Sequence, residues 1–488
     1  MSEHGAARRH PAEGRSRATT AIAAVVAIGL LAAACGDSVS PSQRAASASP
    51  NAPSNAPASG LAGGSPVTPS THLVRMIEQP PAPTDVAVAP ESERIDLAMP
   101  TFSDPTNITN PLFPVSRQES VLMFGLVDDL PFRTEVTLLP FTRIVEWEGQ
   151  QVETLVSQYF AYLDGRIQEV AYDLYAQADD GSVWYFGEDV SDFKDGAIIS
   201  KEGTWLTGKD APAAMIMPAT PKVDDVYRTE NAPGFVFEEV TVKSINETLD
   251  GPLGAVPGGL LIGELHMDGT TEDKTFGPGY GEFLTSGGGD VEALALAVPA
   301  DAASGETPAE LTTLEVGAKA IFEAAGSKDW TTASAEVGKM TIAWKSYRAG
   351  DVPKLAEPAM TAALDGLAAA VNGRDVAASR AAAIDVARSA LDLQLRYRPA
   401  TEIDLARMDL WAAQILVDTA ADDAAAANGD IFTLTYIRDR ILGSVSGSDR
   451  NRIDTKIREL QVAAIDGDLA AEADAAAQLR EIVAGLQP

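Results

Sequence analysis

The sequence predicts an α+β protein of two domains, with an antiparallel β-meander over residues 99–298 and an all-α bundle over residues 307–488. Acidic-Gly turns recur at regular spacing in the first domain, between runs of β-branched and aromatic residues. In the second domain alanine dominates and apolar residues recur with a period of 3.6. A linker of mostly small residues, 299–306, separates the two patterns and marks the domain boundary.

Four turns organise the first domain. Gly149, Gly165, Gly181 and Gly196 each follow an acidic residue and are 16, 16 and 15 residues apart. Asp-Gly between apolar runs favours a type I′ hairpin turn, because both central residues then need φ > 0. Successive hairpins predict a meander that twists into a curved sheet, a half-barrel or a closed barrel. The expected strands are Thr134–Glu146, Gln151–Leu163, Arg166–Gln177, Val183–Phe193, Ala197–Leu206, Phe235–Ile245 and Leu260–Met267.

The second domain opens with Thr307-Pro-Ala-Glu310, which combines an N-cap, a proline in the first turn and a glutamate at the third helical position. Four later turns pair a glycine, which suits the end of one helix, with an aspartate, which caps the next. Short links make neighbouring helices antiparallel, so about four helical hairpins are expected. The turns are Gly326–Asp329, Gly373–Asp375, Gly429–Asp430 and Gly467–Asp468.

The N-terminus has the pattern of an export signal. Four arginines precede an apolar run, Ala21–Ala34, which ends at Cys35, the one cysteine of the sequence. The run has 14 residues, fewer than the roughly 20 that span a bilayer. Its end resembles the lipobox of bacterial lipoproteins, although Ala32 stands where leucine is more common. The resemblance implies that residues 1–34 are removed and that Cys35 carries a diacylglycerol.

Residues 35–98 follow as a lipidated cysteine and a tether rich in Ser, Pro and Ala. The segment has few large apolar residues, so we expect it to be disordered. The expected location is the extracytoplasmic face of a cell membrane, to which the protein is anchored by lipid.

The charge restricts the class of ligand. Without residues 1–34 the chain keeps 33 basic and 68 acidic residues, a formal net charge of −35. Nucleic-acid binding is not expected, because phosphate backbones are bound by basic surfaces. We also expect no metal and no cofactor, because His266 is the single histidine of the β-domain and no second cysteine exists to complete a zinc site.

The most distinctive strand carries Trp184 and Phe186 on one face, and Glu188 and Asp189 follow them. These four residues are the candidate ligand-binding residues. The aromatic pair suggests a carrier that holds an apolar molecule. The two carboxylates suggest a hydrolase of cell-envelope glycans, since such enzymes use paired acids.

The same stretch, Tyr172-Asp-Leu-Tyr-Ala-Gln-Ala-Asp-Asp-Gly-Ser-Val-Trp-Tyr-Phe-Gly-Glu-Asp-Val190, together with Asn110-Pro-Leu-Phe-Pro114, resembles an uncharacterised family of exported bacterial lipoproteins. The resemblance covers residues 107–230 and implies the location of the protein but no activity.

A segment between two helical hairpins concentrates charge beside aromatic residues. Arg398, Glu402, Arg407 and Trp411 are the candidate residues for binding a partner, such as another protein of the cell envelope. The alternative is a polar network that closes the end of the bundle.

Taken together, these patterns predict a lipid-anchored binding or scaffold protein without catalytic activity. A glycan hydrolase and an apolar carrier are the alternatives.

Overall fold

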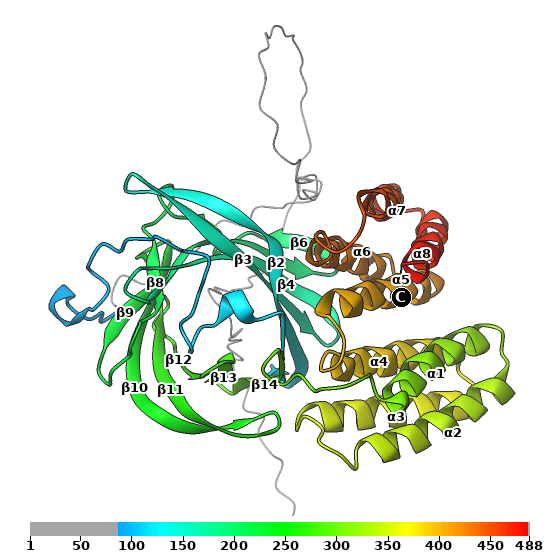
Figure 1. Ribbon diagram of the computed structural model, residues 1–488. Helices are drawn as coiled ribbons and strands as arrows, with labels where there is room; N and C mark the ends of the chain where they lie inside the picture. The colour runs from blue at the N-terminus through cyan, green and yellow to red at the C-terminus, as the bar shows by residue number, and fades with distance from the viewer. Residues whose placement is uncertain (1–85, 487–488) are drawn as a thin grey trace, which may run out of the picture.

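The computed structural model describes residues 86–486. It confirms the predicted α+β architecture, because one large antiparallel sheet is followed by helices (Figure 1). The strands are β1 (Ser120–Val127), β2 (Leu130–Trp147), β3 (Gln150–Leu163), β4 (Arg166–Gln177), β5 (Val183–Lys194), β6 (Ala197–Ser200), β7 (Trp205–Leu206), β8 (Ala214–Met217), β9 (Val226–Ala232), β10 (Val236–Gly251), β11 (Gly254–His266), β12 (Thr271–Gly277), β13 (Gly281–Gly287) and β14 (Asp290–Val298). The helices are α1 (Ala309–Gly326), α2 (Trp330–Tyr347), α3 (Ala356–Gly373), α4 (Val376–Gln394), α5 (Ala400–Ala420), α6 (Ala424–Arg440), α7 (Gly447–Asp466) and α8 (Leu469–Ala484).

The sheet is a long meander. Its strand order is β6-β5-β4-β3-β2-β1-β14-β13-β12-β11-β10-β9, with β7 and β8 also paired to β5. Three of the four predicted hairpin turns, Glu148-Gly149, Asp164-Gly165 and Asp195-Gly196, have positive φ at both central positions. At the fourth, only Gly181 has positive φ, and the longer segment 178–182 joins β4 to β5. The sheet curls until β8 lies beside β9, but no strand ladder within residues 86–486 closes it. Of the three predicted forms, the strongly curved open sheet is therefore the observed one.

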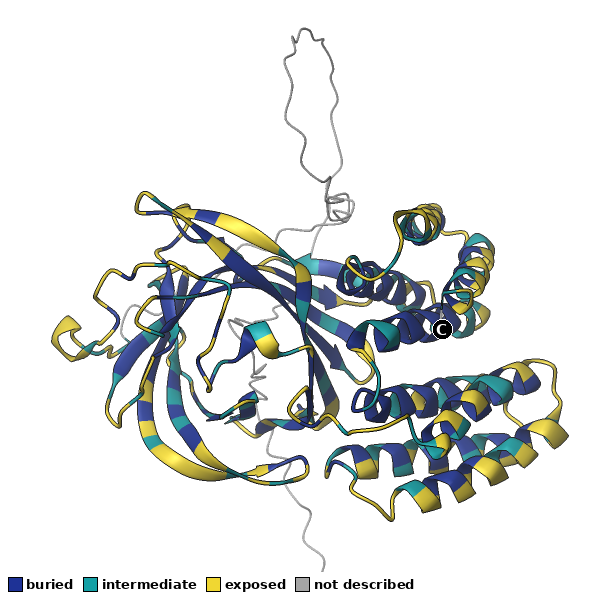
Figure 2. Ribbon diagram, viewed as in Figure 1, coloured by how far each residue is buried: buried dark blue, intermediate teal, exposed yellow. Residues whose placement is uncertain are grey.

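Curling gives the sheet an inner and an outer face. The ring of strands surrounds a short 3-10 helix, η3 (Val115–Arg117), which appears in cyan near the centre of the view (Figure 1). In Figure 2 the strands next to the helices are largely buried, whereas β10 and β11 on the opposite side carry many exposed residues.

The helices form two groups of four, α1–α4 and α5–α8, joined where α4 contacts α5. Three predicted turns are confirmed, and Asp329, Asp375 and Asp468 cap α2, α4 and α8. The prediction of a turn at Gly429–Asp430 is wrong, because both residues lie inside α6 and the actual cap is Asp423. Gly429 packs against the β5–β6 turn: a Cβ on it would come within 3.4 Å of Gly196 Cα.

The second helical group packs on the outer face of the sheet through α6, which contacts β2, β4 and β6. Aromatic side chains fill this contact. Tyr162 of β3 stacks on Trp411 of α5 with ring centroids 5.3 Å apart. Phe160 meets Tyr436 of α6 edge to face.

Buried charges cross the same contact. Arg440 of α6 donates to Glu135 of β2 and to Gln158 of β3, each at 2.6 Å. Arg407 of α5 lies 3.4 Å from the same carboxylate, and Arg133 of β2 approaches it to 2.7 Å. Burial opposes ionisation of Glu135, but Arg407, Arg133 and Arg440 hold its pKa well below the ordinary value.

Several strands were not predicted from the sequence: β1, β8, β9, β12, β13 and β14. The segment expected as one strand, Ala197–Leu206, is interrupted between β6 and β7. Part of the expected tether is also bound to the sheet, since Ile95 N–H donates to Val226 of β9 and Ala89 N–H donates to Glu239 of β10.

Residues 1–34, the proposed lipid site Cys35 and most of the expected tether lie outside the described residues. Between residues 86 and 486 no helix combines the length and the apolar character that a membrane crossing requires.

We expect the Arg440→Met variant to lose roughly 3–5 kcal/mol of unfolding free energy, because Glu135 would keep a buried charge with fewer partners. Urea denaturation followed by circular dichroism measures the change. Arg452→Met, which breaks an exposed pair with Asp449 on α7, is the control and should change stability little. Equal stability of the two variants would contradict the role assigned to Arg440.

Candidate functional site

The inner face of the sheet is strongly acidic. Ten carboxylic acids project from it, and eight of them are buried. The basic side chains on this face are Lys274 and His266. The acids are Glu169, Asp173, Glu188, Asp192, Glu230, Glu238, Glu264, Glu272, Glu282 and Glu292.

The strand register places these acids directly opposite one another. Asp173 of β4 faces Glu188 of β5, and Glu230 of β9 faces Glu238 of β10. Like charges in such positions destabilise a sheet. An acidic face this dense must therefore be neutralised by basic groups, by protons or by a ligand.

Basic groups neutralise one side of the inner face. Lys274 Nζ of β12 lies 2.5 Å from Glu264 and 3.1 Å from Glu272. His266 lies 3.3 Å from Glu238 and 3.6 Å from Glu272. Burial would lower the pKa of His266, but hydrogen bonds to the two glutamates raise it to about 11, so it is protonated.

Glu264, His266 and Glu272 lie close enough together to resemble a metal site, with ligand atoms within 4.8 Å of one another. However, the ammonium group of Lys274 already contacts both glutamates, and a protonated histidine cannot donate a lone pair. This group is better described as a buried ion-pair network than as a metal centre.

The other side of the inner face has carboxylates without a basic partner. Asp173 accepts a hydrogen bond from the Tyr185 hydroxyl at 2.9 Å, and Glu292 accepts one from Thr134. Burial raises the pKa of Asp173 to about 7. Burial and the charge of Glu282 raise the pKa of Glu292 to about 8.

Glu188 is the least satisfied of these acids. Its side chain is 3% exposed, and within residues 86–486 its hydrogen-bond partner is another acid, Glu230, rather than a basic group. Burial, followed by the charge of the neighbouring Glu230, raises the pKa of Glu188 well above its ordinary value. Burial beside a second carboxyl group therefore favours the protonated form of Glu188.

A cavity of about 100 Å³, here called the inner cavity, lies among these groups. Its walls come from η3 and its flanks, from β1 to β4 and from β12 to β14, so strands far apart in the sheet meet around it. The volume equals roughly three water molecules at liquid density. Its polar wall includes Asp173, Glu282, Glu292 and Lys274, and its aromatic wall includes Tyr159 and Tyr175.

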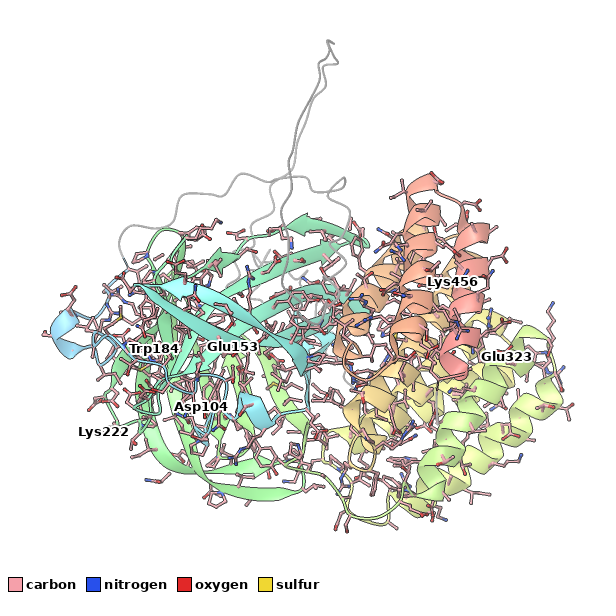
Figure 3. All side chains as sticks on the ribbon, turned by 45° about the horizontal axis from the view of Figure 1, so that its top comes forward. Asp104, Glu153, Trp184, Lys222, Glu323 and Lys456 are labelled. Atoms are coloured by element: carbon pink, nitrogen blue, oxygen red, sulfur yellow. The ribbon has the colours of Figure 1, made fainter. Side chains whose placement is uncertain are left out.

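The predicted aromatic residues lie on the outer face instead. Phe186 is fully buried, and its ring meets those of Phe102 and Trp147 edge to face. Trp184 also packs against Trp147, and it lies within the crowded sheet region (Figure 3). These positions give no support to an apolar carrier site built on this pair.

Glu188 and Asp189 do not form a pair. As neighbours on a strand they point to opposite faces, Glu188 inward and Asp189 outward, where it accepts from Lys201 at 2.9 Å. Their positions do not match the facing carboxylates of a glycosidase.

The candidate partner residues contact the protein's own elements. Arg407 and Trp411 are buried against β2 and β3. Arg398 donates to Glu402 at 3.3 Å and lies 3.6 Å from Glu315 of α1. The four residues therefore belong to polar and aromatic contacts inside the molecule.

The acids of the inner face were missed because alternating polar residues on a strand are normally expected to face solvent. The alternation occurs in the predicted strands β10 and β11, which carry Glu238 and Glu264. It also occurs in β9 and β12, which were not predicted and carry Glu230 and Glu272. The many glutamates of the strand-forming region were a signal for an acidic face. The sequence alone, however, does not show that the sheet curls and encloses this face.

Comparison of the sequence with known protein families and with characterised proteins finds no match. The site must therefore be interpreted from its own geometry.

We expect the folded protein to lose stability as pH rises from 5 to 8.5. Asp173 and Glu292 have folded pKa values of about 7 and 8, above the unfolded values of about 4, so the folded state binds more protons in this range. His266 acts in the same direction, since its raised pKa gives stability that is lost only above pH 6.5. Urea midpoints across this range measure the slope.

The double variant Asp173→Asn, Glu292→Gln should flatten this slope, because it removes two of the titrating groups. Glu153→Gln, an exposed change on β3 (Figure 3), is the control and should leave the slope unchanged. A midpoint that stays constant or rises with pH in the unmodified protein would contradict the assignment.

Proposed function

We propose that this chain is a non-catalytic binding protein, anchored by a lipid on Cys35 at the extracytoplasmic face of a membrane, which holds a small organic cation in the inner cavity. The observation that carries the proposal is the surplus of buried carboxyl groups over basic groups on the inner face. Three of these acids, Asp173, Glu282 and Glu292, line the cavity itself.

The chemistry of the cavity favours an amine over a metal ion. Asp173, Glu282 and Glu292 can accept charge-assisted hydrogen bonds from an ammonium group. The rings of Tyr159 and Tyr175 offer faces that attract cations and cover short alkyl chains. Lys274 in the same wall would repel the concentrated charge of a divalent metal ion strongly, whereas an extended diamine separates its two charges along the chain and can place both near carboxylates.

The volume also limits the ligand. About 100 Å³ admits an amine of a few carbon atoms and excludes a lipid or a folded peptide.

The opposed directions of Glu188 and Asp189 favour binding over glycan hydrolysis. The membrane anchor is supported by the lipobox resemblance and by the resemblance of residues 107–230 to exported lipoproteins.

We expect isothermal titration calorimetry of the mature protein with butane-1,4-diamine to detect binding that is accompanied by proton release. Asp173→Asn should weaken binding by about 10- to 100-fold, because a hydrogen bond to a charged group contributes about 1.5–3 kcal/mol. The asparagine can still accept from Tyr185, so the fold should persist.

The control for this titration is Glu153→Gln, which should bind the diamine as tightly as the unmodified protein. Calcium chloride at matched ionic strength should give no comparable heat. Binding of calcium without the diamine, or equal affinity of the Asp173 and Glu153 variants, would overturn the proposed ligand class.

The anchor is tested separately. We expect mass spectrometry of the protein purified from its own membrane to show a diacylglycerol on Cys35, and we expect Cys35→Ala to release the protein from the membrane fraction. A mature N-terminus at another residue, or unchanged membrane retention of the variant, would contradict lipid anchoring.

A further inference from the structure

A second cavity lies at the contact between the outer face of the sheet and the helices. Its volume is about 170 Å³, and it is here called the junction cavity. Arg133 of β2 and Tyr162 of β3 line it from the sheet, and Arg388 of α4 with Arg407 and Trp411 of α5 line it from the helices. It is separate from the inner cavity, because these strand residues point to the opposite face of the sheet.

The acceptors around this cavity are already occupied. Glu135 contacts Arg133 through one oxygen and Arg440 and Arg407 through the other. Both oxygens of Asp392 accept from Arg133, and one also accepts from Arg407.

Several buried donors nevertheless have no acceptor within residues 86–486. They are Arg407 Nε, Arg440 Nη2 and the hydroxyl of Tyr162. All three residues are more than nine-tenths buried, and Arg407 and Tyr162 form part of the cavity wall. Buried donors are rarely left without a partner, so the junction is a region where donors outnumber the hydrogen bonds made to them.

The cavity wall also has an aromatic and apolar side. Trp411 stacks on Tyr162 at an interplanar angle of 10°, and the guanidinium carbon of Arg388 lies 5.1 Å from the Trp411 ring centroid. Leu410 and Pro131 complete this side. Three guanidinium groups and one carboxylate, that of Glu135, are the charged groups of the wall.

We infer that the junction cavity binds a small organic carboxylate. Its carboxylate would pair with the guanidinium groups of the cavity wall, above all that of the partly exposed Arg388, since guanidinium groups match planar oxyanions. Its hydrocarbon part would lie against Trp411, Leu410 and Pro131. The volume equals roughly five to six water molecules at liquid density, which suits a single ring or a short chain. The inference does not depend on the cation proposed for the inner cavity.

The ligand would bridge the two parts of the molecule. Arg133 belongs to the sheet, whereas Arg388 and Arg407 belong to helices, so one anion would contact both (Figure 1). A ligand that binds only the folded state stabilises it by mass action, and binding should therefore raise the unfolding temperature.

The experiment uses the mature full-length protein and benzoate as the probe, with titration calorimetry and thermal unfolding as measurements. Arg388→Gln is the informative variant, because Arg388 is 21% exposed and forms an ion pair with the exposed Asp385, outside the buried network. We expect it to bind benzoate at least tenfold more weakly. Arg452→Gln on α7 is the matched control and should bind normally.

Benzamide, which has the same ring without the charge, should bind at least tenfold more weakly than benzoate. Arg407→Lys keeps the charge but removes the Nε donor, and it should also weaken binding if it folds. Circular dichroism and a cooperative thermal unfolding transition without ligand show that each variant is folded, independently of either cavity.

Equal affinity of the Arg388 and Arg452 variants for benzoate, or absence of benzoate binding, would overturn the inference. Tight binding of inorganic phosphate with none of benzoate would also overturn it, because the apolar wall would then have no role.

Discussion

Enclosure of acidic side chains by a curled sheet is the constraint on which this structure depends. Side chains alternate between the two faces of a strand, so a sheet that curls on itself removes one set from water. In this protein that set is rich in glutamate, and pairs such as Glu230 and Glu238 face each other across neighbouring strands. The fold is therefore stable only if charge on the inner face is neutralised.

Two kinds of neutralisation occur on different sides of the same face. Lys274 and His266 offset most of the charge of Glu264, Glu272 and Glu238 on the β10–β12 side, and burial raises the pKa of Glu264 to about 8. Asp173, Glu188 and Glu292 form no ion pair among the described contacts, and burial raises the pKa of each of them. Proton-filled sites of this type are open to exchange with a cationic ligand, which links binding to pH.

Much of the fold could be predicted, because its signals are local. The turn at Asp164-Gly165 fixes the β3–β4 hairpin, and Asp329, Asp375 and Asp468 fix helix starts through their own backbone hydrogen bonds. The failure at Gly429 has a non-local cause, since this glycine serves close packing against Gly196 on another element. The inner site was not predictable either, because its cause is also non-local. Asp173 and Glu292 are 119 positions apart in the sequence, and only the curling of the sheet brings them to one cavity.

The two faces of the sheet carry different sets of charged groups. The inner face has carboxyl groups in excess of cations, whereas the outer face at the helix contact pairs Arg133, Arg407 and Arg440 with Glu135, Asp392 and Asp404. Glu135 and Thr134 are adjacent on β2, yet Glu135 binds arginines on the helix side and Thr134 binds Glu292 on the inner side. The sheet thus separates a region rich in unpaired carboxyl groups from a region of paired arginines and carboxylates. A ligand at either cavity would complete hydrogen bonds that the chain alone leaves open, which ties the stability of the architecture to what it binds.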